Sequence, residues 1–326
     1  MHLNHITIVI SAKNEAGNIS SLFNSLKNVD YPLDNFEIIL VNDNSTDLTG
    51  SKAESYKDDF PNLKILKAEN KKYPGKKGAL DLGIKNAINE YILITDADCT
   101  VSPCWLKRYS DKFNEGYDFL FGNAPFIKQT GLANSIARFE NLRSFFLYTT
   151  AYKLNIPYSA SARNFGFKKS SFNKINGYYN TNETISGDDD LLIREAVKNN
   201  MKIGFIPDKD ASVYSCTPAS IKDYLVQKTR HTKTSLYYLP VHKLFLGSWH
   251  LINIALWLTL ILGFYNKLFF IPLIIKIAAD LIIVKTNEGK SNYSFGLLEI
   301  VYLQILYEIF IVINFVNALF REDKWK

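Results

Sequence analysis

The sequence predicts an α/β domain with a mostly parallel sheet, followed by a helical membrane domain. Over the first two thirds of the chain, short apolar runs alternate with helical patterns, which is typical of βαβ units. In the last third, long apolar runs indicate membrane-spanning helices. The 326 residues, 47% of them hydrophobic, allow one sizeable α/β domain and a small membrane domain. We place the three segments at residues 1–218, 219–243 and 244–326.

Four apolar runs in the first segment have the length and composition of buried strands. They are residues 6–10, 36–41, 63–66 and 91–95. Ligands bind outside the carboxyl ends of the strands in such a sheet, so charged residues at or just past these ends are candidates for a binding site. They are Asp43, Lys77, Asp96 and Asp98. No GxGxxG motif follows a strand, which argues against a dinucleotide-binding oxidoreductase.

The most informative motif is Asp96-Ala97-Asp98, directly after the run 91–95. Carboxylates spaced i, i+2 project from the same side of an extended chain. At a strand end they can hold a hard divalent cation, and that cation can carry a diphosphate. On its own this motif is weak, because acidic residues at strand ends are mostly solvated turn residues. The other motifs in the chain give it weight.

A second acidic cluster, residues 186–190, precedes a helical pattern at residues 191–196. One explanation is helix capping, particularly for Asp190, because acids at a helix start accept from free N–H groups and suit the dipole. The other is catalytic. Crowding three acids should raise the pKa of at least one carboxyl toward neutral, which suits a general base.

Taken together, the short motifs resemble those of family 2 glycosyltransferases, and they occur in that family's order over residues 5–231. The matching segments are residues 8–15, 41–47, 77–78, 96–98, 187–189 and 227–230. The resemblance implies the GT-A nucleotide-sugar-binding fold. It also implies inverting transfer of a sugar from a nucleotide diphosphate sugar to a hydroxyl group. Such a single displacement requires no covalent nucleophile.

The resemblance implies roles for the acidic residues. Asp189 would be the general base that deprotonates the acceptor hydroxyl, with Asp188 as the alternative. Asp98 would bind the metal, and Asp96 would hold the ribose or a metal-bound water. Mg²⁺ or Mn²⁺ suits oxygen ligands and a diphosphate better than zinc does.

The resemblance also implies a nucleotide site. Asp43 would accept from the ring N–H of the base, while Ala12 and Glu15 would lie near the base or ribose. Asn42 departs from the aspartate that the family usually has there, which leaves the nucleotide less defined, with uridine preferred. Lys77 is a compact cation that would meet the diphosphate. Without the family's motif order, a solvated lysine would be the simpler explanation.

Two arginines complete the expected donor site. Arg163 follows the small residues 159–162, which would let donor sugar or acceptor approach the backbone. Arg230 belongs to residues 227–231, which resemble the QxxRW motif of membrane-bound, often processive, synthases, and would steady the diphosphate. His231 replaces the final tryptophan and offers less surface for stacking, which argues against a long-chain polymerase. The competing explanation is a basic juxtamembrane segment, residues 222–243.

Three apolar runs follow as expected membrane helices, at residues 244–264, 267–284 and 295–320. Lys276 and Asp280 interrupt the second run and are spaced to pair on one helix face. Charged residues within spans normally face a partner or a cavity. They would either tie the helices together, which we favour, or line a route for the head group of a lipid acceptor. A third alternative places the last helix in the membrane interface.

Basic residues before the first apolar run and between the second and third place both segments in the cytoplasm. We expect no signal peptide, because the first apolar run is a strand candidate that begins at residue 6. We therefore expect a multi-pass protein of the cell membrane with its catalytic domain on the cytoplasmic side. Residues 321–326 would be external if all three helices cross, which their basic residues oppose. The helical pattern at residues 132–154 either packs on its own domain or lies at the membrane surface.

The net charge of +6 lies partly near the first apolar run, so anionic membrane lipid is the expected partner and nucleic acid is not. The three cysteines form no CxxC motif and fit a reducing compartment. The sequence is also compatible with a homo-oligomer. We expect a metal-dependent inverting glycosyltransferase that moves one sugar from a nucleotide diphosphate sugar, with UDP as the preferred nucleotide, to a lipid-linked or glycan acceptor.

Two alternatives remain. A processive polysaccharide synthase would need a translocation channel, for which three helices are few unless the protein oligomerises. Outside the enzymes, the alternative is a non-catalytic nucleotide-sugar sensor or a membrane scaffold. Intact Asp98 and Asp189 speak against it, because a sensor has no need of the base. The sequence does not identify the sugar or the acceptor.

Overall fold

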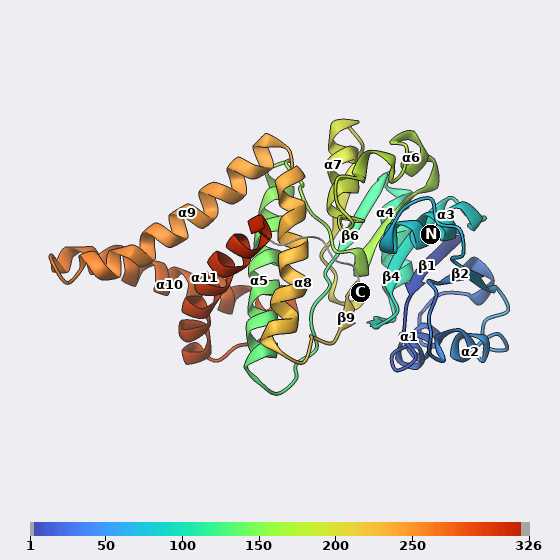
Figure 1. Ribbon diagram of the computed structural model, residues 1–326, viewed down its shortest axis with the longest axis horizontal. Helices are drawn as coiled ribbons and strands as arrows, with labels where there is room; N and C mark the ends of the chain where they lie inside the picture. Colours follow the sequence, from blue (N-terminus) through green and yellow to red (C-terminus); the bar gives the residue numbers. More distant parts are fainter. Residues whose placement is uncertain (1–2, 321–326) are drawn as a thin grey trace. The chain divides into compact units, whose positions relative to one another are not determined.

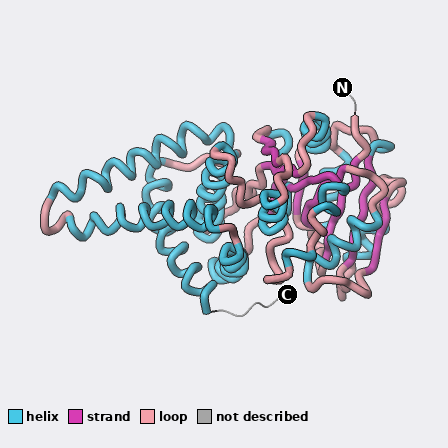
Figure 2. Tube along the Cα trace, turned by 90° about the horizontal axis from the view of Figure 1, so that it is seen from above, coloured by secondary structure: helices cyan, strands magenta, loops and turns pink. Residues whose placement is uncertain are grey.

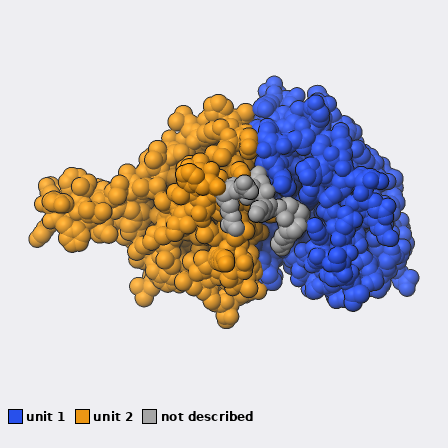
Figure 3. All heavy atoms as spheres, viewed as in Figure 1, with its two compact units in different colours: residues 1–127, 148–216, 323–326 blue, residues 128–147, 217–322 orange. Residues whose placement is uncertain are grey.

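The computed structural model describes residues 3–320 (Figure 1). Within that range the chain forms two compact units, which Figure 3 shows in different colours. Unit 1 contains residues 3–127 and 148–216, and unit 2 contains residues 128–147 and 217–320. The expected external position of residues 321–326 lies outside the described residues.

Unit 1 is built on a seven-stranded sheet with the order β3-β2-β1-β4-β7-β6-β8. Neighbouring strands are parallel except that β7 is antiparallel to both β4 and β6. The strands are β1 Ile6–Ala12, β2 Phe36–Asn42, β3 Leu63–Lys67, β4 Tyr91–Asp96, β6 Phe119–Gly122, β7 Phe165–Lys168 and β8 Ile203–Ile206. A separate antiparallel pair joins β5 Cys99–Val101 to β9 Val213–Ser215. The predicted α/β class with a mostly parallel sheet is confirmed.

Both faces of the sheet are buried, which explains why the central strands are continuously apolar. In β1, Ile8 and Ile10 belong to one hydrophobic core and Val9 belongs to the other. Burying each of these side chains stabilises the fold by about 1.5–3 kcal/mol. The helices of unit 1 appear around the sheet in Figure 2. They are α1 Ile19–Lys27, α2 Thr49–Glu54, α3 Gly75–Asn86, α4 Trp105–Asn114, α6 Lys169–Lys174 and α7 Asp190–Lys198.

The strand register brings the carboxyl ends of β1, β2 and β4 to one edge of the sheet. Ser11 lies opposite Asp96, and Ala12 lies opposite Asn42. Just past β2, the backbone N–H of Asp43 donates to the carbonyl of Ala12 at 2.8 Å. This edge is where parallel sheets bind their ligands.

Unit 2 is helical. Its helices are α5 Leu132–Lys153 (residues 132–147 belong to this unit), α8 Ile221–Thr234, α9 Pro240–Leu262, α10 Phe270–Ser291 and α11 Leu297–Phe320. Helices α9 and α10 form a hairpin that extends away from α5 and α8 in both Figures 1 and 2. Among the described residues, α9 and α11 are long and apolar enough to cross a membrane. Helix α10, which covers the second expected span, is not one of them, and it carries Lys276 and Asp280.

Candidate active site

Asp96 and Asp98 lie at the end of β4 and just beyond it, with the buried Ala97 between them. The Asp96 side chain is partly buried, whereas Asp98 is exposed. Loss of solvent around the carboxylate, together with the charge of Asp96, raises the pKa of Asp98 although the residue as a whole is exposed. Asp98 is therefore accessible at this edge of the sheet, although its carboxylate is partly shielded from solvent.

Lys76, the second residue of α3, joins the two acidic motifs. Its Nζ lies 2.5 Å from Asp96 Oδ1 and 2.9 Å from Asp188 Oδ2. Burial alone would disfavour the ammonium, but Asp188 and Asp96 outweigh it and raise the pKa of Lys76 above its usual range. The motif analysis missed this residue. The sequence did offer a signal, because Lys76 and Lys77 are adjacent at a predicted helix start. Adjacent helical residues point about 100° apart, so only one of the two lysines can face the site, and either one was a candidate.

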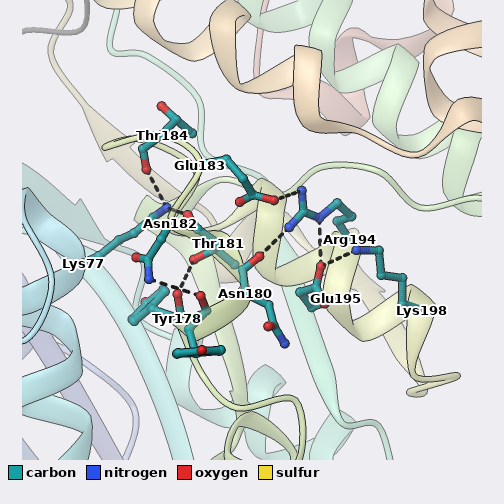
Figure 4. Close-up of polar contacts among 11 residues, drawn as sticks. Lys77, Tyr178, Asn180, Thr181, Asn182, Glu183, Thr184, Arg194, Glu195 and Lys198 are labelled. Atoms are coloured by element: carbon teal, nitrogen blue, oxygen red, sulfur yellow. Dashed lines mark hydrogen bonds and ion pairs between the residues drawn. The ribbon is translucent and has the colours of Figure 1, made fainter.

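Lys77 points elsewhere and is buried (Figure 4). Its Nζ donates to the carbonyl of Thr184 at 3.0 Å and to the carbonyl of Thr181. Burial lowers the pKa of Lys77 to about 8. The next residue, Gly78, has no room for a side chain, since a Cβ there would lie 2.0 Å from the carbonyl oxygen of Tyr73. Lys77 therefore fixes the segment that leads to the Asp188 loop.

The same segment is tied to α7 by a charged network (Figure 4). Arg194 donates to the carbonyl of Asn180 at 2.6 Å and pairs with Glu183 at 2.9 Å. It also pairs with Glu195 at 2.9 Å, and Glu195 pairs with Lys198 at 2.8 Å. Because α7 begins beside the acidic loop, this network holds the loop at both ends.

Asp188 and Asp189 follow Gly187, whose φ of +82° is a conformation that favours glycine. Asp189 is the N-cap of α7. Its Oδ1 accepts from the backbone N–H of Asp190 at 2.7 Å, and its Oδ2 accepts from that of Ala162 at 2.6 Å. Asp190 accepts from the Ser159 hydroxyl at 2.7 Å. The residue that caps α7 is thus Asp189, the expected general base, rather than Asp190.

The pKa values of the adjacent carboxyl groups of Asp188 and Asp189 are shifted in opposite directions. Burial, followed by the charges of Asp190 and Asp188, raises the pKa of Asp189 well above its usual value. Burial also acts on Asp188, but Lys76 outweighs it and lowers the pKa of Asp188. Neighbouring carboxyls with separated pKa values are typical of sites in which one group handles a proton and the other stays ionised.

The expected nucleotide residues gather at the ends of β1 and β2. Asp43 is buried, and both its carboxylate oxygens accept from Lys71 Nζ, at 2.6 and 2.8 Å. Ala12 is fully buried at the end of β1. Glu15 accepts from the Asn18 amide at 2.7 Å. The structure thus places a cation on the carboxylate that is expected to meet the base.

Arg163 lies in the 3₁₀ turn Ala162–Asn164. It directly follows Ala162, whose backbone N–H donates to Asp189. Its guanidinium donates to the carbonyl of Ala124 at 2.8 Å and to the hydroxyl of Ser215, and it lies 4.4 Å from the centroid of the Phe126 ring. Arg230 lies in α8 of unit 2.

Among residues 3–320, no group of three or more His, Cys, Asp or Glu side chains is arranged to hold a metal ion. Asp98 and Asp96 nevertheless offer two carboxylates of the donor type that Mg²⁺ and Mn²⁺ prefer, and these cations usually take their remaining ligands from phosphates and water. The residues therefore fit a cation that arrives with a diphosphate.

The sequence model described as "Glycosyl transferase family 2" matches residues 7–175. Glycosyltransferase AglE of Haloferax volcanii is 25% identical over 224 residues, which cover 68% of this chain and 70% of AglE. The poly(ribitol-phosphate) beta-N-acetylglucosaminyltransferase TarS of Staphylococcus aureus is 27% identical over 205 residues, 62% of this chain. The alignment spans only about a third of TarS, 34% of its length.

Two solved structures share the fold. TarS 1–349 in complex with UDP-GlcNAc has a TM-score of 0.52 and 21% identity, covering 98% of this chain and 93% of that one. The mannosyltransferase PcManGT of Pyrobaculum calidifontis, in complex with GDP-Man and Mn²⁺, has a TM-score of 0.60 and 16% identity, covering 99% and 89%. These likenesses confirm the predicted GT-A fold.

Proposed function

The chain belongs to glycosyl transferase family 2 and is a glycosyltransferase that acts on nucleotide sugars, and we propose that it moves one sugar from a UDP-sugar to a lipid-linked or glycan acceptor at a membrane. The observation that carries the proposal is the joining of the two acidic motifs through Lys76. Asp96 of the expected donor-binding motif and Asp188, which precedes the proposed base Asp189, therefore contact the same ammonium group.

Asp189 is the general base in this proposal. Its raised pKa suits a group that must take a proton from an acceptor hydroxyl near neutral pH. The backbone N–H groups of Ala162 and Asp190 hold both its oxygens in place. Asp188 stays ionised against Lys76 and positions that lysine, rather than accepting the proton itself.

Lys76 takes the diphosphate contact in this proposal, in place of Lys77. Its ammonium lies between Asp96 and Asp188, whereas that of Lys77 is directed at two backbone carbonyls. Asp98 and Asp96 would hold Mn²⁺ or Mg²⁺, which when bound would stabilise the charge on the leaving diphosphate. Lys77 keeps the acidic loop in position.

Uridine is the proposed nucleoside, with Asp43, Ala12 and Glu15 on the side of the base and ribose. The support is the likeness to TarS, whose fold is seen with UDP-GlcNAc. PcManGT, seen with GDP-Man, supports a guanosine donor as the second candidate. Arg163 would line the donor site beside Asp189. The role of Arg230 at the diphosphate stays a prediction from its motif.

The long apolar helices of unit 2 bear on the acceptor and on the location of the protein. Two helices long and apolar enough to span a membrane suggest membrane association, which favours an acceptor that is lipid-linked or is itself a membrane-bound glycan. Contact with anionic lipid and a cytoplasmic catalytic domain follow from the basic residues around α8 and α9.

The test is nucleotide release by the full chain in detergent, from UDP-, GDP- and dTDP-sugars, with Mn²⁺ or Mg²⁺ and with EDTA. We expect release from a UDP-sugar that needs the metal. Asp98→Ala should lose the metal-dependent release, and Asp189→Asn should lower kcat by about 10²–10⁴ because the base is lost. Unchanged kcat in Asp189→Asn would overturn its assignment as the base, and release from GDP-sugars alone would move the nucleoside to guanosine.

A further inference from the structure

The two faces of α11 differ sharply. Large apolar side chains are exposed along one stripe with helical spacing: Leu298, Tyr302, Ile305, Ile309, Val312 and Val316. The opposite face is buried and includes Gln304, Glu308 and Asn314. The most apolar window of α11 is 39% buried, compared with 6% for α9. Helix α11 therefore has one face that needs an apolar environment and one face that is already occupied by protein.

Helices α5 and α8 occupy that second face. Phe295, just before α11, lies against Arg138 of α5, with 5.0 Å between guanidinium carbon and ring centroid. Along α11 itself, Tyr307 contacts Phe139 and Arg143 of α5, while Phe310 stacks on Tyr224 and Asn314 donates to Thr232 of α8. The buried side chains of α11, from Ile300 to Ala318, extend over roughly 27 Å of helix, at about 1.5 Å per residue.

That length is close to the thickness of a bilayer's hydrocarbon core, about 30 Å. The helices beside it are charged over the same stretch. Glu140 of α5 accepts from the Tyr224 hydroxyl at 2.7 Å and pairs with Lys228 of α8 at 2.9 Å. Further charged residues on the two helices are Arg138, Arg143, Lys222, Asp223, Arg230 and Lys233.

The direction of α11 follows from these charges. If α11 stood across the bilayer, α5 and α8 would be carried into the hydrocarbon beside it, together with most of their charges, which is costly. If α11 lies along the membrane surface, its apolar stripe meets acyl chains while the charges of α5 and α8 remain among the head groups. Only the second arrangement satisfies both faces.

We propose that α11 lies in the plane of the membrane, in the leaflet next to α5 and α8, and does not cross. The proposal rests on the membrane association proposed above. The part of unit 2 that enters the bilayer is then the α9–α10 hairpin, since α9 carries no Asp, Glu, Lys or Arg after Lys243. Because a hairpin returns the chain to its starting side, α8 and α11 share one face of the membrane.

The buried charges of α10 agree with this assignment. Asp280 pairs with Lys276 at 2.9 Å and with Arg143 of α5 at 2.8 Å. Lys276 also donates to Gln304 of α11 at 3.3 Å. The charges of the hairpin are therefore met by α5 and α11 inside unit 2, rather than by lipid.

The test measures the membrane depth of four positions on the α11 stripe. Spin labels are placed singly on I305C, I309C, V312C and V316C in the full chain, with Cys104 and Cys216 replaced by serine. The protein is reconstituted into vesicles of phosphatidylcholine and phosphatidylglycerol, and oxygen and nickel-chelate accessibilities give the depths. We expect four similar depths. A steady change in depth from residue 305 to residue 316, roughly 16 Å of helix, would show a crossing helix and overturn the proposal.

Other outcomes are equally decisive. Four water-exposed labels, or spin–spin broadening that reveals a second copy on this face, would also overturn it. Labels at Leu251 of α9 and at Phe264, just past the end of α9, are the comparison, because the two positions should differ in depth. Failure of the protein to float with the vesicles would reject membrane association and this proposal together. Nucleotide release by the same vesicles tests the enzymatic proposal separately, because it does not depend on the tilt of α11.

Discussion

Lys76 and Lys77 are adjacent in the sequence and serve different parts of unit 1. Lys76 lies between two carboxylates of the proposed donor site, and Lys77 donates to two carbonyls of the loop that precedes Asp188. The helical turn at the start of α3 separates them by about 100°. A matched pair of substitutions can therefore separate ligand binding from loop stability.

Lys76→Gln should have opposite effects on metal and donor. Loss of the ammonium frees Asp96 and Asp188 from their cation, so Mn²⁺ should bind the donor-free protein more tightly. The donor should bind roughly tenfold to a hundredfold more weakly, because a charged hydrogen bond contributes about 1.5–3 kcal/mol. Titrations of Mn²⁺ by magnetic resonance and of UDP by calorimetry measure the two affinities.

Lys77→Gln is the control. It should leave the Mn²⁺ affinity near the wild-type value and lower the Tm, because two buried carbonyls lose their donor. Weaker Mn²⁺ binding in Lys76→Gln would mean that the lysine supports the cation site rather than competing with it.

Asp190→Asn should move the pH dependence of the reaction. Asp189 must be ionised to act as a base, so kcat/KM should fall as the pH falls through its pKa. That pKa is raised by burial and then by the charge of Asp190. Removing the charge should lower the pKa and shift the acidic limb of the profile to lower pH, while the amide oxygen can still accept from Ser159.

The profile of log(kcat/KM) against pH measures this shift. Glu54→Gln, on the exposed α2, removes one negative charge far from the loop and should leave the limb in place. An acidic limb that does not move in Asp190→Asn would mean that another group sets it.

At the scale of the element, α3 is held against the sheet by close packing at Gly83. A Cβ there would lie 2.5 Å from Val9 Cγ1 of β1 and 3.2 Å from Val41 Cγ2 of β2. Both valines are buried and branched at Cβ, which limits their adjustment. The close approach sets the position of the helix that carries both lysines.

Gly83→Ala should therefore destabilise unit 1, although alanine is the better helix former by about 1 kcal/mol. Overpacking a filled core costs about 1–3 kcal/mol, so the net loss should be about 1 kcal/mol. Thermal unfolding in detergent measures it. Gly17→Ala, where no atom lies within 4 Å of the added Cβ, should leave the Tm nearly unchanged. An increase of Tm in Gly83→Ala would show that α3 can move away from the sheet.

The strength of the sequence prediction differs between elements. Strands β1, β2 and β4 are mostly apolar runs with a polar segment after each, so their pattern is evident, whereas β3 is a shorter run that contains Lys64 and Lys67. Strands β6 and β7 have four residues each and lie on either side of the long α5, so neither shows a pattern of its own. Their antiparallel pairing depends on contacts distant in sequence, which periodicity does not encode. Lys76 was missed for a similar reason, since its partners come from β4 and the loop before α7.

At the scale of the whole molecule, the two units have different interiors. Unit 1 buries aliphatic and aromatic side chains on both faces of a sheet, whereas unit 2 buries paired charges among long helices. Residues 128–147 belong to unit 2 although more than half of unit 1's strands precede them in the chain. Composition separates the long apolar helices α9 and α11 from the sheet, but α5 contains both apolar and charged residues and gives no signal of which unit it joins.

A donor should stabilise only the unit that binds it. The proposed nucleotide and metal residues Asp43, Asp96 and Asp98 all lie in unit 1. At a concentration of 100 times its Kd, a ligand that binds only the folded state contributes about 2.7 kcal/mol. For a unit of this size, that should raise the Tm by roughly 5–10 °C. Calorimetry of the full chain in detergent, with UDP and Mn²⁺, should show this increase in one of two transitions and none in the other.

Asp98→Ala is the control, because it should keep both transitions and lose most of the shift. Two separate cores make two transitions the expectation, since each unit can lose its own packing without exposing the other's. A single transition that moves as a whole would mean that the helices of unit 2 depend on the folded sheet. In that case the charged pairs around Asp280 would be sustained by unit 1, and a substitution at Gly83 would lower the stability of both units equally.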